Sequence, residues 1–484
     1  MKIEIANGGM TLETIAELAG GTLFADARKR KMTITGIATD SREVSEGTLF
    51  LGIRGERVDG NNFMETALAG GASAVLGERI PEGAPGVLVP DTVLALGRIA
   101  TAVKTSHGLP TVAVTGSVGK TTTKEMLYAV LSQHYRVHAT KGNFNSNIGL
   151  PMSVLEMPRE SETAVFELGM SGMMEIDYLS KLIRPDIGII TNIGVSHMEA
   201  LGSRENIAKA KLEILNGMNP GSTVLLNGDE PLLLSARREI EHRGIRPMYV
   251  SVEREVQPIN PEADVIASNI RSKYLHTIFD LSFSGRTYRN LTLSVMGKHN
   301  VYAAAFAFAV GALSEVPEEK LRAGLLSFRA APMRQSLAIL GGVLVIEDCY
   351  NASPESMCAA LDVAQTLAKE SGNGRVMALL GDMRELGETS PDLHRNVGRY
   401  AAQKGVGELF TFGSESSAFL AAGAVDAGIP ADRIHRHEDA TGFESVGRMI
   451  LDTMRAGDVL LVKASRALRA ERVVSYLREH AVSP

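Results

Sequence analysis

The segment Thr111-Val112-Ala113-Val114-Thr115-Gly116-Ser117-Val118-Gly119-Lys120-Thr121-Thr122 is the most informative stretch of this chain. It starts with a short apolar run and passes through a glycine-rich turn to a Lys-Thr pair, after which residues 123–132 have the composition of a helix. A strand, a glycine-rich turn, a Lys-Ser/Thr pair and a helix in this order are the context of a phosphate-binding loop. The segment therefore predicts a nucleotide site on an α/β sheet.

Each residue type in this loop has a physical role. Gly116 and Gly119 allow backbone N–H groups to converge on phosphate oxygens, because no Cβ atom stands in the way. The N-terminus of the following helix adds a partial positive charge. Lys120 can reach the β- and γ-phosphates, and the Thr121 hydroxyl can bind Mg²⁺. The predicted phosphate-binding set is Gly116, Ser117, Gly119, Lys120, Thr121 and Thr122.

The loop departs from the general pattern at one position. Val114 stands where that pattern has its first glycine, five residues before Gly119. An ordinary glycine-serine turn at the start of a helix is the alternative explanation for such a segment. The strand before it and the helix after it favour the phosphate-binding loop.

Two downstream residues are candidate metal ligands. Glu167 follows the apolar run 163–166, and His197 follows the run 187–190 by a few residues. Mg²⁺ prefers hard oxygen ligands, so Glu167 is the expected partner of Thr121. A single histidine after a strand is more often a capping or core residue than a ligand. Its place at the carboxyl edge of a nucleotide-binding sheet nevertheless makes His197 a candidate.

Short apolar runs alternate with Ala/Leu/Glu-rich stretches along the chain, which is typical of βα units on parallel sheets. Proline and glycine clusters near residues 81–91 and 330–332 divide it into three expected domains, 1–91, 92–331 and 332–484. Within the middle domain we expect a β-hairpin over Thr277–Val295 and a buried, alanine-rich helix over Val301–Leu313.

Composition excludes several classes of function. The 484 residues have 44% apolar and 22% charged side chains, as in an ordinary globular protein. A formal charge of −6, no Trp and only 5% aromatic residues argue against a nucleic-acid-binding surface. Two cysteines, no apolar signal segment and no apolar run of about 20 residues predict a cytoplasmic protein without membrane insertion.

Four motifs together resemble the ATP-dependent Mur ligase family, whose members form amide bonds in peptidoglycan precursors and related molecules. They are the loop 115–121, Glu167, His197 and Gly297-Lys298-His299-Asn300. The family's loop is a Thr-Gly-x-x-Gly-Lys-Thr variant, which accounts for Val114. The resemblance covers nearly the whole chain. It implies a small α/β uridine-nucleotide domain, a central P-loop sheet and a C-terminal Rossmann-like domain.

Two segments resemble one branch of that family, the ligases that add D-alanyl-D-alanine to a UDP-N-acetylmuramoyl-tripeptide. These are Glu347-Asp348-Cys349-Tyr350-Asn351-Ala352-Ser353-Pro354 with the following Glu-Ser-Met, and Gly381-Asp382-Met383-Arg384-Glu385-Leu386-Gly387. The resemblance implies those two substrates, a monomer, and an acyl phosphate made with ATP and two Mg²⁺ ions. It leaves open whether the third residue of the acceptor peptide is diaminopimelate or lysine.

The resemblance also carries over individual roles. Lys120, Glu167, His197 and Lys211 would form the catalytic set, with Thr121, Glu167, His197 and Lys211 serving the metals and Lys211 carbamylated. Asn300, Arg334 and Asp348 would contact the nucleotide. The substrate-binding set would be Ser41, Arg42, Asn143, Asn145, Asn147, Asn351, Lys463, Ser465 and Arg466. Without the resemblance, the sequence around Lys211 predicts an exposed lysine on a helix. The cluster of Asn143, Asn145 and Asn147 predicts a turn.

Several positions depart from the family pattern, among them Ala303, Glu347 and Ser353. These changes bear on substrate recognition more than on the reaction. Two alternative functions also stay open at this point. One is another amide-forming relative, either a folylpolyglutamate synthetase or the ligase that adds the third residue of the peptide. The other is a nucleotide-switched binding protein without ligase activity.

Overall fold

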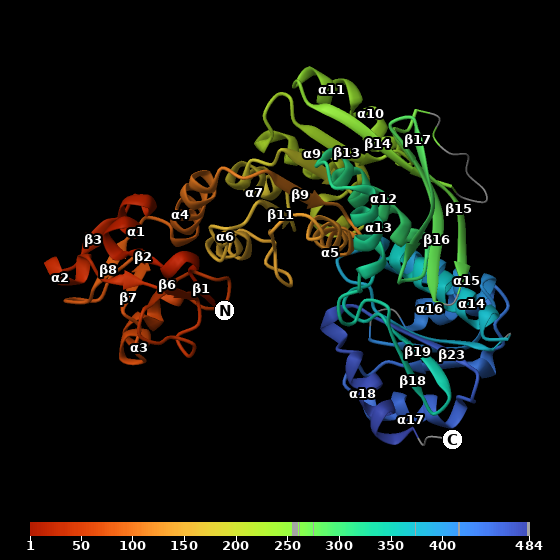
Figure 1. The fold of residues 1–484 in the computed structure, drawn as a ribbon. Coiled ribbons are helices and arrows are strands. Elements are labelled where there is room, and N and C mark those ends of the chain that lie inside the picture. The colour runs from red at the N-terminus through yellow and green to blue at the C-terminus, as the bar shows by residue number, and fades with distance from the viewer. Residues whose placement is uncertain (254–259, 261, 274, 373, 415–416, 482–484) are drawn as a thin grey trace.

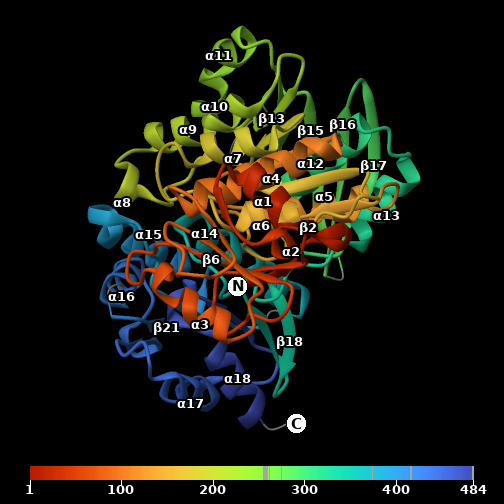
Figure 2. The same cartoon turned by 90° about the vertical axis from the view of Figure 1, so that its left-hand side faces the viewer.

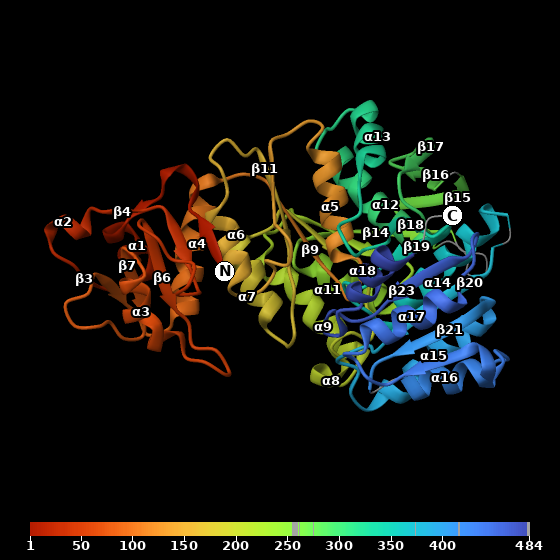
Figure 3. The same cartoon turned by 90° about the horizontal axis from the view of Figure 1, so that it is seen from below.

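A computed structural model describes the chain except residues 254–259, 261, 274, 373, 415–416 and 482–484. Its strands form three large sheets in three successive parts of the chain, and helices cover their faces (Figure 1). This three-part α/β architecture confirms the predicted fold class. The part built from the first 90 residues lies at one end of the molecule and contacts the central part through Asn7, while the third part lies against the central part elsewhere (Figures 1 and 3).

The first sheet has six strands in the order β1-β5-β6-β7-β8-β3. Strands β5 to β8 are parallel, and the two edge strands run antiparallel to their neighbours. A separate pair joins β2 to β4. The elements of this part are β1 (Lys2–Glu4), β2 (Met10–Thr11), α1 (Leu12–Ala19), β3 (Thr22–Phe24), α2 (Ala27–Arg30), β4 (Thr33–Ile34), β5 (Gly36–Ala38), β6 (Thr48–Gly52), α3 (Met64–Ala69), β7 (Ala74–Gly77) and β8 (Gly86–Leu88).

Helix α4 (Thr92–His107) connects this part to the next. The Asp91 side chain caps its first turn by accepting from the Leu94 N–H, and Gly108 ends it in a left-handed conformation. The helix packs against α1 on one side and against α6 and α7 of the central part on the other. It therefore belongs to the contact between the two parts, close to the expected boundary at residue 92, and the boundaries stay predictions.

The central sheet has nine strands in the order β10-β11-β9-β12-β13-β14-β15-β16-β17. The first seven are parallel, and β16 and β17 are antiparallel additions at one edge. The elements are β9 (Thr111–Thr115), α5 (Lys120–Leu131), β10 (Val137–Ala139), α6 (Gly149–Leu155), β11 (Thr163–Glu167), α7 (Glu175–Ile183), β12 (Ile187–Ile190), α8 (Met198–Leu201), α9 (Arg204–Leu212), β13 (Thr223–Asn227), α10 (Pro231–Ser235), α11 (Arg237–His242), β14 (Arg246–Val252), β15 (Val265–Lys273), β16 (His276–Phe283), β17 (Arg286–Leu293), α12 (Lys298–Leu313) and α13 (Glu318–Ser327).

Two local predictions in this part are confirmed. Strands β16 and β17 form the expected hairpin, and alternate side chains of β16, such as Phe279 and Leu281, are fully buried. Helix α12 is buried along most of its length, because its alanines allow the sheet and helices α5 and α13 to pack closely around it. The central sheet thereby gains a continuous core on this face.

The third sheet has six strands in the order β18-β19-β23-β20-β21-β22, of which only β18 is antiparallel. Its elements are β18 (Ser336–Leu340), β19 (Val343–Glu347), α14 (Pro354–Glu370), β20 (Val376–Gly381), α15 (Ser390–Gln403), β21 (Val406–Phe412), α16 (Ser417–Asp426), β22 (Ile434–His437), α17 (Phe443–Thr453), β23 (Val459–Lys463) and α18 (Glu471–His480). Helices lie on both of its faces (Figure 2).

Both cysteines, Cys349 and Cys358, are free, and burial raises the pKa of each thiol to about 12. They are therefore held as neutral thiols. No helix in the described ranges is long and apolar enough to cross a membrane.

The loops after β11, β9 and β12 lie side by side at the carboxyl edge of the central sheet. Ligand sites of parallel sheets usually lie at this edge.

Candidate active site

The predicted phosphate-binding loop connects β9 to α5 at the carboxyl edge of the central sheet. Helix α5 begins at Lys120, three residues earlier than the sequence predicts. Gly119 takes a left-handed conformation, with φ of +85°, so the chain can turn directly into the helix. Lys120 and Thr121 consequently lie in the first helical turn, and the Lys120 Nζ donates to the Gly116 carbonyl over 2.8 Å.

Two residues after β12 hold this loop in shape. The Thr191 hydroxyl donates to the Val118 carbonyl over 2.6 Å, and the Asn192 side-chain oxygen accepts from the Val118 N–H over 2.8 Å. The Asn192 carbonyl accepts from the Ser117 N–H. A Cβ atom on Gly116 would stand 1.9 Å from the Thr191 hydroxyl, so only glycine fits there. Neither Thr191 nor Asn192 is predicted from the sequence as a site residue, because the contact depends on β12 lying beside β9.

Glu167 is the hydrogen-bonding centre of the site. Its carboxylate is almost fully buried and accepts from the Thr121 hydroxyl and from the Asn145 side-chain amide, each over 2.8 Å. The Glu167 N–H donates in turn to the Thr140 hydroxyl. A buried carboxylate beside a threonine hydroxyl is a donor set that suits Mg²⁺ when phosphate and water supply the remaining oxygens. In the described ranges no three His, Cys, Asp or Glu side chains gather as metal ligands, and such a magnesium site does not need them.

Arg334 reaches this centre from the third part of the chain. Its Nη2 atom donates to the Thr121 hydroxyl over 3.1 Å, and its guanidinium lies over the Tyr350 ring, 4.2 Å from the centroid. Nearby, the Lys463 ammonium donates to the Asp348 carboxylate over 2.6 Å and to the Asn351 carbonyl over 3.1 Å. The structure therefore brings Arg334 to the phosphate-binding loop, whereas Lys463, Asp348 and Asn351 contact one another within the third part of the chain.

Two lysines of the predicted set share an unusual environment. Burial is the main cause that lowers the pKa of Lys120, opposed by the carboxylate of Glu167. Burial also holds the pKa of Lys211 well below its ordinary value, and the positive charge of Lys120 lowers it further. The Lys211 side chain is 1% exposed, which contradicts its interpretation as an exposed helix lysine. Burial raises the free energy of the charged ammonium, so it favours the neutral form of Lys211.

The predicted residues His197 and Asn300 both contact the part of the chain that follows α13. The His197 Nδ1 atom lies 2.5 Å from a carboxylate oxygen of Glu385, a residue of the third part of the chain. Asn300 lies in the first turn of α12, where its side-chain amide donates to the Met296 carbonyl over 2.7 Å and to the Gln335 side chain over 3.2 Å. Asn300 thus contacts Gln335, the neighbour of Arg334, and His197 contacts Glu385, which follows β20 of the third sheet.

Other predicted residues lie away from this centre. Arg42 is exposed and pairs with Asp40 in its own loop, which lowers the pKa of that carboxyl, and Ser41 belongs to the same turn. In the loop before α6, Asn143 and Asn147 are exposed. The remaining third-domain residues differ: Asn351 is exposed, Ser465 is buried, and Arg466 pairs with Glu471 over 2.8 Å.

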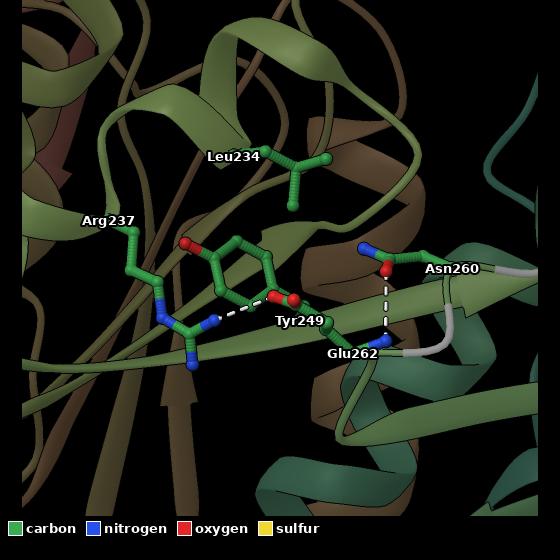
Figure 4. Close-up of a pocket in the computed structure, with 5 residues that line it drawn as sticks. All are labelled: Leu234, Arg237, Tyr249, Asn260 and Glu262. Carbon is green, nitrogen blue, oxygen red and sulfur yellow. Dashed lines mark hydrogen bonds and ion pairs between the residues drawn. The ribbon is translucent and has the colours of Figure 1, made fainter.

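Two cavities lie outside this centre. One, of about 720 Å³, opens between the first and central parts beside Lys2, Ser45, Lys141 and Glu156. Another, of about 320 Å³, lies at the outer end of the central sheet, where the Arg237 guanidinium faces the Tyr249 ring (Figure 4). Neither is lined by a residue predicted from the sequence to bind nucleotide or substrate.

Comparison with known families agrees with this geometry. The family model described as Mur ligase middle domain matches residues 114–311, and the model for the Mur ligase, glutamate ligase domain matches 333–466. A third model, Mur ligase family, catalytic domain, matches residues 33–107. The chain belongs to the Mur ligase family. The resemblance stated from the motifs is therefore confirmed.

Individual Mur ligases match along almost the whole chain. The UDP-N-acetylmuramoyl-tripeptide–D-alanyl-D-alanine ligase of Bacillus subtilis is 38% identical over 98% of this chain and 99% of its own length. A crystal structure of MurF from Acinetobacter baumannii is similar with a TM-score of 0.85 and 29% identity, covering 97% of this chain and 98% of its own. MurF of Thermotoga maritima in complex with ADP is similar with a TM-score of 0.79 and 27% identity, covering 92% and 97%.

The position of Arg334 leads to a first prediction for this Mur ligase. Arg334→Ala removes a cation that lies beside the Thr121 hydroxyl, so we expect the affinity for ADP with Mg²⁺ to fall by about tenfold or more. Arg329→Ala is the matched control, because Arg329 lies in the same linker and only donates to nearby carbonyls. Isothermal titration calorimetry measures both. Equal affinities in the two variants would contradict a role of Arg334 at the nucleotide.

Proposed function

We propose that this Mur ligase joins D-alanyl-D-alanine to the terminal carboxylate of a UDP-N-acetylmuramoyl-tripeptide at the expense of ATP. One observation carries the proposal: Lys120, Thr121, Glu167 and Arg334 converge on one loop at the carboxyl edge of the central sheet. The names of the relatives and the two signature segments 347–357 and 381–387 support the choice of substrates. The proposal includes a monomer acting in the cytoplasm, where ATP is available.

Amide formation from a carboxylate requires activation, because a carboxylate is a poor electrophile. We infer that the tripeptide carboxylate attacks the γ-phosphorus of ATP in line, giving an acyl phosphate and ADP. The dipeptide amine then attacks the acyl carbon, and phosphate leaves from the tetrahedral intermediate. This order uses the energy of the phosphoanhydride bond to provide a good leaving group.

The main obstacle is electrostatic, since both the peptide carboxylate and the triphosphate are anions. Two like charges about 4 Å apart repel by about 4 kcal/mol at an effective dielectric near 20. Lys120 and Arg334 offer positive charge from two sides of the loop, and α5 points its N-terminus toward the same place. These groups would bring the two anions together and stabilise the charge of the transferring phosphoryl group.

Mg²⁺ is the expected cofactor, and the residues present suit it. Thr121 and Glu167 would hold one ion, and His197 with a carbamylated Lys211 would hold a second. When bound, the ions would neutralise phosphate and carboxylate charge during transfer. The chain's own residues prepare the site: Asn145 fixes the Glu167 carboxylate by hydrogen bonding, and Arg334 fixes the Thr121 hydroxyl.

Carbamylation of Lys211 has a physical basis in its surroundings. Carbon dioxide reacts with a neutral amine, and burial holds the pKa of Lys211 well below its ordinary value, which increases the share of the neutral amine. The Lys211 side chain is 1% exposed, and the positive charge of Lys120 adds to the effect of burial on its pKa. The carbamate would replace a buried cation by an anion, which can serve a metal and relieves repulsion from Lys120.

The substrates would approach from different domains. The uridine nucleotide would bind the first domain near Ser41 and Arg42, and the loop with Asn143, Asn145 and Asn147 would receive the muramoyl-peptide. Asn300, Arg334 and Asp348 would contact the nucleotide, and Asn351, Lys463, Ser465 and Arg466 would hold the dipeptide. Contact between the second and third domains would exclude water and protect the acyl phosphate from hydrolysis.

The alternatives are less well supported. A folylpolyglutamate synthetase does not need a uridine-nucleotide domain, which we propose for residues 1–91 of this chain. A Mur ligase family model matches residues 33–107, which overlap this range. The ligase that adds the third peptide residue lacks the segments 347–357 and 381–387. A binding protein without ligase activity would not need a third sheet reaching the phosphate-binding loop.

The first test of the function uses Lys120. Phosphate release should require ATP, the UDP-muramoyl-tripeptide and D-alanyl-D-alanine together. Lys120→Ala should reduce turnover by about 10³-fold or more, because the cation nearest the phosphates is lost. Unchanged circular dichroism would show that the fold is intact. Near-normal turnover in this variant, or phosphate release without the dipeptide, would overturn the proposal.

The second test concerns Lys211. Protein equilibrated with ¹³C-bicarbonate near pH 8 should show a carbamate carbonyl signal by NMR, and Lys211→Met should abolish it. Lys209→Met is the matched control, because Lys209 lies on the same helix with its side chain exposed. Acidification should remove the signal, since protonation of the amine withdraws the reactive form. A spectrum identical in wild type and Lys211→Met would exclude the carbamate.

A further inference from the structure

One contact between the second and third parts of the chain has no role in the function described so far. The His197 Nδ1 atom lies 2.5 Å from the Glu385 Oε2 atom. His197 follows β12 in the central sheet, and Glu385 follows β20 in the third sheet, inside the segment 381–387. Two residues 188 positions apart therefore meet across the contact between two domains.

Both residues have an uncommon backbone conformation. His197 has φ of +65° and Glu385 has φ of +64°, and both are side-chain-bearing residues in the left-handed region. Each such residue costs about 1 kcal/mol relative to an ordinary conformation. The two left-handed residues are also the two whose side chains face each other, and strained positions of this kind often occur at functional sites.

Backbone contacts hold the same two turns together. The Glu199 N–H donates to the Glu385 carbonyl over 3.2 Å, and a Cβ atom on Gly387 would stand 3.2 Å from the Glu199 Cα atom. A second acidic residue of the third part, Glu355, accepts from the Val195 N–H over 3.2 Å. The loop 194–199 thus donates two hydrogen bonds to the third domain, one from Glu199 and one from Val195.

The contact with Glu385 determines which nitrogen of the neutral His197 imidazole carries the proton. A carboxylate facing Nδ1 favours a proton on that nitrogen, which leaves Nε2 as the lone-pair nitrogen. Metal-bound histidines commonly have such a partner, which sets the tautomer and the direction of the ring. Glu385 also stands close enough to Lys120 for its charge to raise the pKa of that lysine, so the pair belongs to the surroundings of the phosphate-binding loop.

The pair contributes little to stability by itself. The Glu385 side chain is 57% exposed and the His197 side chain is 20% exposed. Ion pairs of this exposure are typically worth about 0–1 kcal/mol. Its value therefore lies in orientation, and a variant that lacks Glu385 should fold normally.

We propose that Glu385 is a positioning residue that orients His197 from the third domain, so that the imidazole presents Nε2 to the site only when the two domains are in contact. The role of His197 toward a metal rests on the proposed function, whereas its orientation by Glu385 does not. Domain contact and assembly of the site would then be one event. A detached third domain would leave the histidine without its partner.

The test reads the histidine directly, in protein without nucleotide, metal or substrate. Side-chain ¹⁵N NMR of histidine-labelled protein near pH 8 distinguishes the two neutral tautomers, and His197→Gln assigns the signal. Wild type should show the Nδ1–H form, and Glu385→Ala should shift His197 toward the Nε2–H form. Glu388→Ala is the control, because Glu388 is an exposed carboxylate in the same loop. An unchanged His197 spectrum in Glu385→Ala overturns the proposal.

A second arm uses the complete reaction. With Glu385→Ala the Mg²⁺ concentration for half-maximal rate should rise by about tenfold or more, and Glu388→Ala should match wild type. An unchanged Mg²⁺ requirement in Glu385→Ala contradicts the positioning role. Failure of the proposed function would appear separately, as loss of substrate-dependent phosphate release in wild type, and would leave the NMR result intact.

Discussion

The hydrogen bonds accepted by the buried carboxylate of Glu167 organise the candidate site. They bind the first turn of α5 through Thr121 and the loop before α6 through Asn145. Burying a carboxylate is expensive unless hydrogen bonds or cations compensate for the lost water. The loops around Glu167 consequently have to stay in place, and that requirement fixes where a phosphate group and its cation can be held.

The third part of the chain completes this centre from outside. The turn between α13 and β18 brings Arg334 onto the Thr121 hydroxyl, and both neighbours of Arg334, Met333 and Gln335, take left-handed conformations. The same domain reaches the loop after β12 through Glu355 and Glu385. This arrangement suits chemistry that must exclude water, because the Arg334 cation belongs to the same part of the chain that covers the site.

Much of this could be predicted from the sequence, and the limits have a physical cause. The buried parallel strands and the hairpin expected over Thr277–Val295 could be predicted, because both depend on local patterns of apolar residues. The start of α5 was predicted too late, since Lys120, Thr121 and Thr122 are polar and the helix is set by Gly119. The contacts of Thr191 and Asn192 with the phosphate-binding loop depend on strand order, which no local pattern encodes. The role of Glu385 cannot be predicted from the sequence, because its partner His197 lies in another part of the chain.

In the proposed reaction, ATP phosphorylates the peptide carboxylate at this loop before the amide forms. This step can be followed by labelling the terminal carboxylate of the UDP-muramoyl-tripeptide with ¹⁸O and analysing the released phosphate by mass spectrometry. We expect one ¹⁸O atom in each phosphate, because the oxygen that bridged to phosphorus leaves with it. Amide product accompanied by unlabelled phosphate would contradict the proposed phosphorylation.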